Sequence, residues 1–164
     1  RNFERLRAPF TRYRIPVGDY HFRDSTISYN SDRSRRFGGK IAYTFGEFWN
    51  GRQQSPSGDI TFKPNYHWQV DTTFNHTKIT LPSGKFVTTL VGLKVLYAHS
   101  SKIFVNNFFQ YNSERRQLSA NVRFNIIHHP LSDIFVVFNQ RLDTRTRQVI
   151  DRGIIFKFTN LFNF

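Results

Sequence analysis

The last residues of the chain alternate between apolar and polar side chains. Counting back from the C-terminus in steps of two gives a row with a single polar member: Phe164, Phe162, Asn160, Phe158, Phe156 and Ile154. The other row is mixed and carries a charge: Asn163, Leu161, Thr159, Lys157 and Ile155. Successive side chains of a β-strand point to opposite faces, so this pattern predicts a strand with one oily and one wettable face.

The same alternation recurs along the chain and predicts about nine strands of roughly 9 to 13 residues. That length is close to the ~9 to 11 residues with which a tilted strand crosses a bilayer. The weakest strand is interrupted by Pro56 and Gly58 before it reaches Ile60 and Phe62. The others are predicted at residues 20–29, 38–48, 66–72, 86–97, 102–111, 118–126, 133–141 and 152–164.

The sequence predicts that the connections between these strands alternate between short and long. Short turns are expected at 63–65, 99–101 and 129–132, and longer connections at 75–85, 113–117 and 143–150. Asn50-Gly51 is a strong tight-turn dipeptide. Membrane barrels alternate in this way, with short periplasmic turns and longer outer loops, although the 30–37 link is longer than this rule expects. Lone bacterial barrels favour even strand numbers, so an odd count indicates a misread strand or further strands upstream.

Composition agrees with a membrane barrel. Phenylalanine occurs 19 times and aromatics make up 17% of the 164 residues, while Cys and Met are absent. The sequence contains no run of ~18 apolar residues, so no membrane-spanning helix is predicted. The length predicts one domain, 1–164, with residues 1–19 irregular or forming a partial strand. Because the chain starts without Met or a signal peptide, we expect it to be a fragment of a longer exported protein.

The charge of +13, from 24 Lys and Arg against 11 Asp and Glu, limits the partners. A basic chain with many aromatic rings is also typical of single-strand nucleic-acid binders. Here, however, the arginines cluster in predicted loops and strand ends, so we expect anionic lipid headgroups and lipopolysaccharide phosphates as partners, and no nucleic acid. The arginines in question are Arg33, Arg35, Arg36, Arg115, Arg116, Arg145, Arg147 and Arg152.

Taken together, the pattern predicts an all-β, antiparallel, up-and-down transmembrane β-barrel of about 8–10 strands, complete or forming the C-terminal part of a larger barrel. The polar rows then predict a mostly cationic interior that is either a hydrogen-bonded plug or a pore favouring anions or sugars. Candidate lumen-lining residues are Lys40, Lys94, Asn106, Gln110, Asn121, Arg123, Asn125 and Lys157, with Thr44 and Asn139 beside them.

No catalytic, cofactor or metal motif is evident in the sequence. None of the six histidines stands in a metal-ligand or nucleophile pattern, and we expect His128-His129 to end a hairpin. Asp143, Asp151 and Glu114 lie in or beside predicted outer loops, where solvated carboxylates are more common than calcium ligands. We therefore expect no enzyme activity, no cofactor and no metal in this segment.

The C-terminal strand resembles the closing strand of a bacterial outer-membrane β-barrel. In such barrels the terminal aromatic residue belongs to the signal read by the barrel-assembly machinery. The resemblance implies that role for Phe164, Phe162, Phe158 and Phe156.

A wider resemblance covers Ile15 to Phe164. The segments IPVGDYHF, GEFWNG, KPN, ITLPSGKF, NFFQYN, ANVRFNIIHHPLSDIFVVFNQRLDTRT and RGIIFKFTNLFNF occur in that order. The most specific are Gln110-Tyr111-Asn112, residues 121–124 and residues 132–139. This order is similar to the C-terminal barrel, without assigned function, of bacterial proteins common in Bacteroidetes. Those proteins carry an N-terminal family 9 carbohydrate-binding-like domain, which is absent here, so sugar binding does not transfer to these residues.

The resemblance implies a Gram-negative outer-membrane location and a membrane-anchor, transport or structural role in a glycan-associated surface protein, with glycans bound through an upstream domain. Two alternatives remain open. One is a soluble basic β-barrel or sandwich that binds an anionic polymer such as nucleic acid. The other is an outer-membrane barrel hydrolase.

Overall fold

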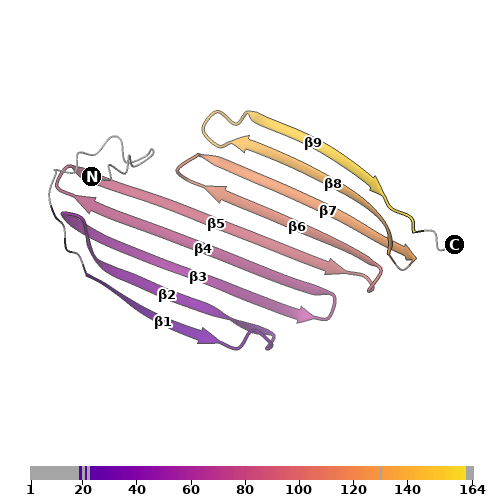
Figure 1. Ribbon diagram of the computed structural model, residues 1–164, viewed down its shortest axis with the longest axis horizontal. Coiled ribbons are helices and arrows are strands. Elements are labelled where there is room, and N and C mark those ends of the chain that lie inside the picture. The colour runs from indigo at the N-terminus through magenta and orange to yellow at the C-terminus, as the bar shows by residue number, and fades with distance from the viewer. Residues whose placement is uncertain (1–18, 20, 22, 130, 162–164) are drawn as a thin grey trace.

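The computed structural model describes residues 19, 21, 23–129 and 131–161 of the chain. In these residues nine antiparallel strands follow one another in chain order across a single sheet, and there is no helix (Figure 1). The prediction of an all-β, up-and-down architecture is confirmed. The strands are β1 (Asp24–Ser31), β2 (Phe37–Phe48), β3 (Gly51–Asn65), β4 (Trp68–Leu81), β5 (Gly84–Ala98), β6 (Ile103–Asn112), β7 (Gln117–His129), β8 (Ser132–Asp143) and β9 (Val149–Phe158).

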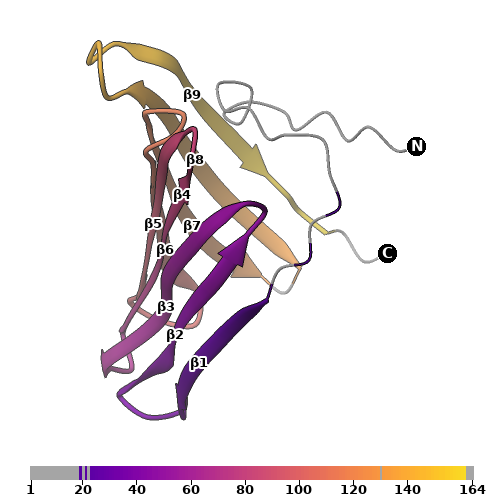
Figure 2. The same ribbon diagram turned by 90° about the vertical axis from the view of Figure 1, so that its left-hand side faces the viewer.

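The sheet is curved but open. Figure 2 shows it curling so that β1 and β9 lie at the two margins of the curve. Among the described residues β1 pairs only with β2, and β9 only with β8. The predicted irregular segment, residues 1–19, lies outside the described residues except for Asp19.

The two ends of the sheet carry different turns. The Phe158 end, on the right in Figure 1, holds the β1–β2, β3–β4, β5–β6 and β7–β8 turns and the end of β9. The Arg116 end, on the left, holds the β2–β3, β4–β5, β6–β7 and β8–β9 turns. Odd-numbered strands all run toward the Phe158 end, so β1 and β9 are parallel to each other.

Two of the expected turn features are wrong. Strands β4 and β5 pair continuously from Trp68↔Tyr97 to Leu81↔Gly84, so residues 75–85 form a hairpin closed by residues 82–83 and not a long loop. Turns of two to five residues occur at both ends of the sheet, so long and short connections do not alternate. Strand β3 also continues through Pro56 and Gly58, with no ladder pair to β4 between Gln54 and Ser57, where the proline lacks an N–H to donate.

Short side chains fix the turns by accepting backbone hydrogen bonds, a common role of Asn and Asp. At the β6–β7 turn the Asn112 Oδ1 accepts from the backbone N–H groups of Glu114 and Arg115, both at 3.0 Å. Asn65 and Asp143 make the same pair of bonds at their own turns. At the β1–β2 turn, hydrogen bonds from the Ser34 side chain and backbone lower the pKa of Asp32.

Glycine allows β2 to approach β3 closely. The backbone of Gly39 has φ 154°, and a Cβ placed there would lie 2.1 Å from the backbone carbonyl oxygen of Asp59. On β3, a Cβ at Gly58 would lie 2.5 Å from the ring of its cross-strand partner Phe74. The Phe74 ring thus occupies the space above a glycine, an arrangement that pins the register of neighbouring strands.

Candidate functional site

The predicted lumen-lining residues all lie on one face of the sheet. Residues paired across antiparallel strands share a face, and faces alternate along each strand. The register joins Lys40 through Asp59, Thr73 and Gly92 to Gln110, and places the other candidates in neighbouring rows of the same face. This polar face holds Lys40, Lys94, Asn106, Gln110, Asn121, Arg123, Asn125 and Lys157, together with Thr44 and Asn139.

The polar face lies on the inside of the curve. Strand side chains that are at most 9% exposed, apart from Ser132 at the start of β8, all belong to it: Ser55, Thr61, Ile79, Leu81, Asn125 and Val137. Curling presses side chains together on the concave side of a sheet and spreads them on the convex side. Even a polar residue such as Asn125 is only 4% exposed here.

Hydrogen bonds between neighbouring strands link much of the polar face. Thr61 donates to Asp71 and Thr73 donates to Asp59, both at 2.8 Å, forming two reciprocal bonds between β3 and β4. Further cross-strand bonds join Thr26 with Thr44, Ser55 with Thr77, and Asn121 with Asn139. Because these groups bond one another, much of the face is satisfied without a ligand.

Carboxylates on this face were missed by the sequence-based reasoning. Asp59 stands opposite Lys40, and Asp71 stands opposite Lys94. Asp59 also lies 3.9 Å from the guanidinium of Arg33. Asp59 falls in the strand whose alternation is interrupted by Pro56 and Gly58, so no face is predicted for it. Asp71 lies between Val70 and Thr72, so the alternation of that strand is the signal that could have found it. The β2–β5 part of the polar face is therefore mixed in charge and not mostly cationic.

The β7–β9 part differs because two cations share one aromatic ring. The Arg123 guanidinium carbon lies 4.3 Å from the centroid of the Phe135 ring, and the Lys157 ammonium lies 5.6 Å from it. Arg123 donates from Nε to the Oδ1 of Asn125 at 2.9 Å. In the part of the chain that the structure describes, neither cation is paired with a carboxylate.

The opposite face is apolar and exposed. Val91 pairs with Phe74 and Tyr111. The row continues through Gly58, Ile41 and Tyr29 toward β1, and through Leu118 and Leu142 toward β9. Val91 is 37% exposed and Phe124 is 39% exposed, although each lies in a strand with neighbours on both sides. In a protein dissolved in water such side chains would normally be buried.

Charged side chains on the apolar face stay close to the Arg116 end. They occur within four residues of the strand terminus at that end, and among the described strand residues they are Glu47, Arg52, Lys78, Lys85 and Arg152. The rest of the face carries mainly apolar side chains, with Ser, Thr, Asn, Gln and His side chains interspersed among them. This face is therefore an apolar band whose charged side chains lie near the Arg116 end.

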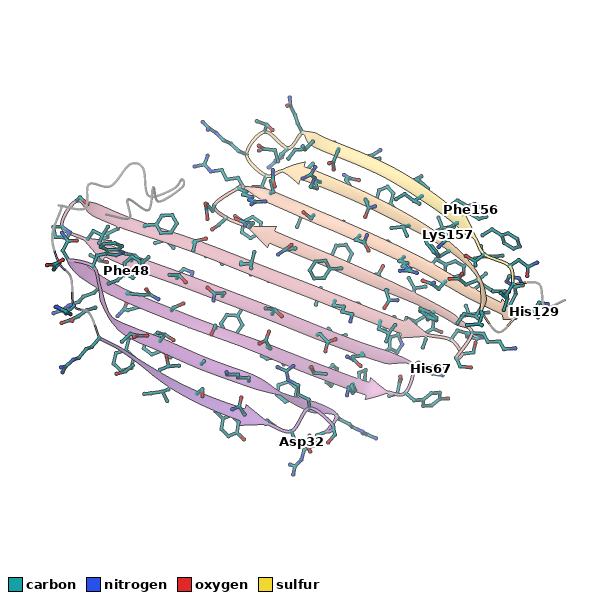
Figure 3. The ribbon with its side chains drawn as sticks, in the orientation of Figure 1. Asp32, Phe48, His67, His129, Phe156 and Lys157 are labelled. Atoms are coloured by element: carbon teal, nitrogen blue, oxygen red, sulfur yellow. The ribbon has the colours of Figure 1, made fainter. Side chains whose placement is uncertain are left out.

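Aromatic and histidine side chains gather at the Phe158 end. The rings of Trp68 and Tyr97 lie 4.6 Å apart, and the His67 Nδ1 lies 2.6 Å from the carbonyl oxygen of Ala98. His128 stacks on Phe158 with ring centroids 5.6 Å apart. Figure 3 shows the labelled His67, His129 and Phe156 at this end and Phe48 at the other. His129 ends β7, so the predicted hairpin-end position is correct.

Two of the four residues assigned to the assembly signal can be placed. Phe156 and Phe158 lie on the apolar face of β9 and are 66% and 55% exposed. Phe162 and Phe164 lie outside the described residues. Strand β9 has a free edge in the described sheet, so backbone N–H and C=O groups along that edge are available to pair with another strand.

Neither a metal-binding cluster in the described residues nor a matching protein identifies the function of this chain. The described residues include no group of three or more His, Cys, Asp or Glu side chains placed to hold a metal ion. They also include no helix of the length and hydropathy that a membrane span requires. Comparison of the chain with protein-family models, with curated proteins and with solved structures gives no match.

Proposed function

We propose that this chain is part of a bacterial outer-membrane β-barrel, with its apolar face toward lipid and its polar face toward the centre. The observation that carries the proposal is the sorting of side chains over the whole sheet. Val91, Phe124 and Phe156 lie on one face, and Lys94, Arg123 and Lys157 lie on the other. A barrel in a membrane needs this sorting, since hydrocarbon meets one face and water or a packed polar interior meets the other.

Closure of the proposed barrel needs further strands. Because β1 and β9 run in the same direction, joining them directly would create a parallel pair. Bacterial single-chain barrels are antiparallel with even strand numbers. We therefore propose that an odd number of additional strands lies between β9 and β1, so that each edge gains an antiparallel neighbour.

The biological role follows from this placement and from the resemblance given by the sequence. We propose that the barrel anchors, or serves transport or structure in, a glycan-associated surface protein of a Gram-negative outer membrane. The exposed arginines of the Arg116 end suit contact with anionic headgroups and lipopolysaccharide phosphates. No catalytic role is assigned to this segment.

Lipid contact can be measured directly because the chain contains no cysteine. Val91→Cys and Gln110→Cys place a single thiol on opposite faces of neighbouring strands. After labelling with an environment-sensitive dye and reconstitution into phospholipid vesicles, brominated lipid should quench the dye at position 91 strongly and the dye at position 110 weakly.

Equal quenching at both positions, or stronger quenching at position 110, would contradict the proposal. A soluble sandwich, the alternative open from the sequence, buries position 91 against a second apolar layer and gives no quenching by lipid at either site. Heating before electrophoresis gives an independent check, because a folded membrane barrel changes its migration and a soluble sandwich does not.

The proposed assembly signal predicts a large effect of the last residue. Replacing Phe164 by Ser, or deleting it, should strongly reduce the fraction of protein that reaches the heat-modifiable, membrane-inserted form in cells. The neighbouring Asn163→Ser serves as a control and should assemble normally. If both variants accumulate equally well in the outer membrane, Phe164 has no part in targeting.

A further inference from the structure

We propose that Arg123 and Lys157, held over the Phe135 ring on the polar face, bind a small oxyanion such as a phosphate or carboxylate group. The three residues come from β7, β9 and β8, and the antiparallel register places Lys157 directly opposite Phe135. Arg123 lies one row away, diagonal to the same ring. The inference rests on these contacts and does not depend on what covers the apolar face.

A hydrogen bond orients the guanidinium group of Arg123 but uses only part of its donor capacity. Its Nε donates to Asn125, a side chain only 4% exposed, which fixes the plane of the group. Within the described residues its two terminal amino groups make no hydrogen bond to protein. These two groups form the fork that binds carboxylate or phosphate through two parallel hydrogen bonds.

Two further groups complete the cluster. Lys157 contributes a second positive charge, a flexible ammonium that can approach an anion beside the fork. Asn106 is the cross-strand partner of Arg123, and its amide makes no side-chain hydrogen bond in the described part of the chain. The Arg123 guanidinium and the Lys157 ammonium, 4.3 Å and 5.6 Å from the Phe135 ring centroid, are attracted by the ring, which supplies no neutralising charge.

The other cations of the polar face differ in this respect. Arg141 bonds Asp151, Lys40 stands opposite Asp59, and Lys94 stands opposite Asp71. The Arg123–Lys157 cluster combines two positive charges with no carboxylate directly across the strands from either. Asp133 lies on the same face two residues from Phe135, but among the described residues it forms no ion pair with Lys157. The buried Val137, next to Arg123 on β8, adds an apolar wall that strengthens electrostatic attraction there.

The test is a titration of the refolded full chain in detergent with inorganic phosphate at constant ionic strength, followed by calorimetry. Chloride sets the baseline for non-specific screening, and acetate tests whether a carboxylate binds as well as phosphate. Phosphate is expected to bind with a stoichiometry of one, and Arg123→Gln is expected to weaken it ~10-fold or more. Arg123→Lys keeps the charge but removes the fork, and should weaken binding by several-fold, about 3- to 10-fold.

Matched variants distinguish phosphate binding at the Arg123–Lys157 cluster from non-specific attraction of phosphate to a basic protein. Lys157→Gln should weaken phosphate binding by about 3- to 10-fold, whereas Lys94→Gln removes the same charge from the same face and should change it by less than about 2-fold. Circular dichroism checks that each variant keeps its strand content. Equal losses for Lys94→Gln and Lys157→Gln, unchanged binding in Arg123→Gln, or no binding above the chloride baseline would each overturn the proposal.

The phosphate titration and the lipid-quenching experiment test independent claims, so either can fail without the other. Loss of dye quenching at position 91 would reject the membrane placement and leave the oxyanion site untouched. Absence of phosphate binding would reject the site while the outward orientation of Val91 still stood.

Discussion

Val91→Arg should lower the free energy of unfolding in a phospholipid bilayer by about 2–4 kcal/mol. Val91 lies in the central strand β5, with Phe74 and Tyr111 as its cross-strand neighbours on the apolar face. If that face meets hydrocarbon, the guanidinium must enter the bilayer near its middle, where arginine costs about this much. The measurement is a reversible guanidinium chloride titration of the protein in vesicles, followed by the fluorescence of Trp49 and Trp68.

The control is Gln110→Arg, which adds the same group to the polar face of the next strand. We expect a change of less than about 0.5 kcal/mol there, as for a tolerant surface position. A cost for Val91→Arg no larger than that for Gln110→Arg would mean that the Val91 face meets water. The pair of variants therefore reports the orientation of the sheet, and not merely sensitivity to arginine.

Gly39→Ala should destabilise the sheet by about 2–4 kcal/mol wherever the protein resides. The added methyl group would lie 2.1 Å from the carbonyl oxygen of Asp59, a backbone atom that cannot turn aside. The φ angle of 154° adds strain, because side-chain-bearing residues rarely adopt it. Overpacking and backbone strain each contribute of the order of 1–3 kcal/mol.

Gly153→Ala is the matched control for this variant. An added Cβ at Gly153, in β9, meets no atom within 4 Å. Its effect on the free energy of unfolding should therefore stay below about 0.5 kcal/mol. If Gly39→Ala unfolds at the same denaturant concentration as Gly153→Ala, the backbone of β2 does not approach that of β3 closely enough to exclude a Cβ at position 39.

The sequence predicted the faces of the sheet well because alternation is a local property. Residues 118–126 alternate without exception, and the register confirms Arg123 and Asn125 on one face and Phe124 on the other. The same rule assigned Lys40, Lys94 and Lys157 to one face, although they lie in strands far apart in the chain. Strand number was predicted equally well, since each turn interrupts the alternation.

Turn positions were predicted less well because polar residues near a strand end resemble a loop. The stretch from Asn75 to Lys78 is polar on both faces, yet the side chain of Thr77 bonds Ser55 and that of His76 bonds Thr89. Those partners are separated from them by more than ten residues in sequence and are not visible in a local pattern. For the same reason the meeting of Arg123 and Lys157 at one ring could not be predicted, since it depends on the register between strands.

The consecutive strand order also shapes how the sheet is made. Every strand pairs with the one before it in sequence, so each step of assembly closes only a short stretch of chain. The sheet of such a chain can form one hairpin at a time. Each added hairpin contributes its own turn and extends both the polar and the apolar face. The width of the sheet is then adjustable in units of two strands, without redesign of the strands already in place.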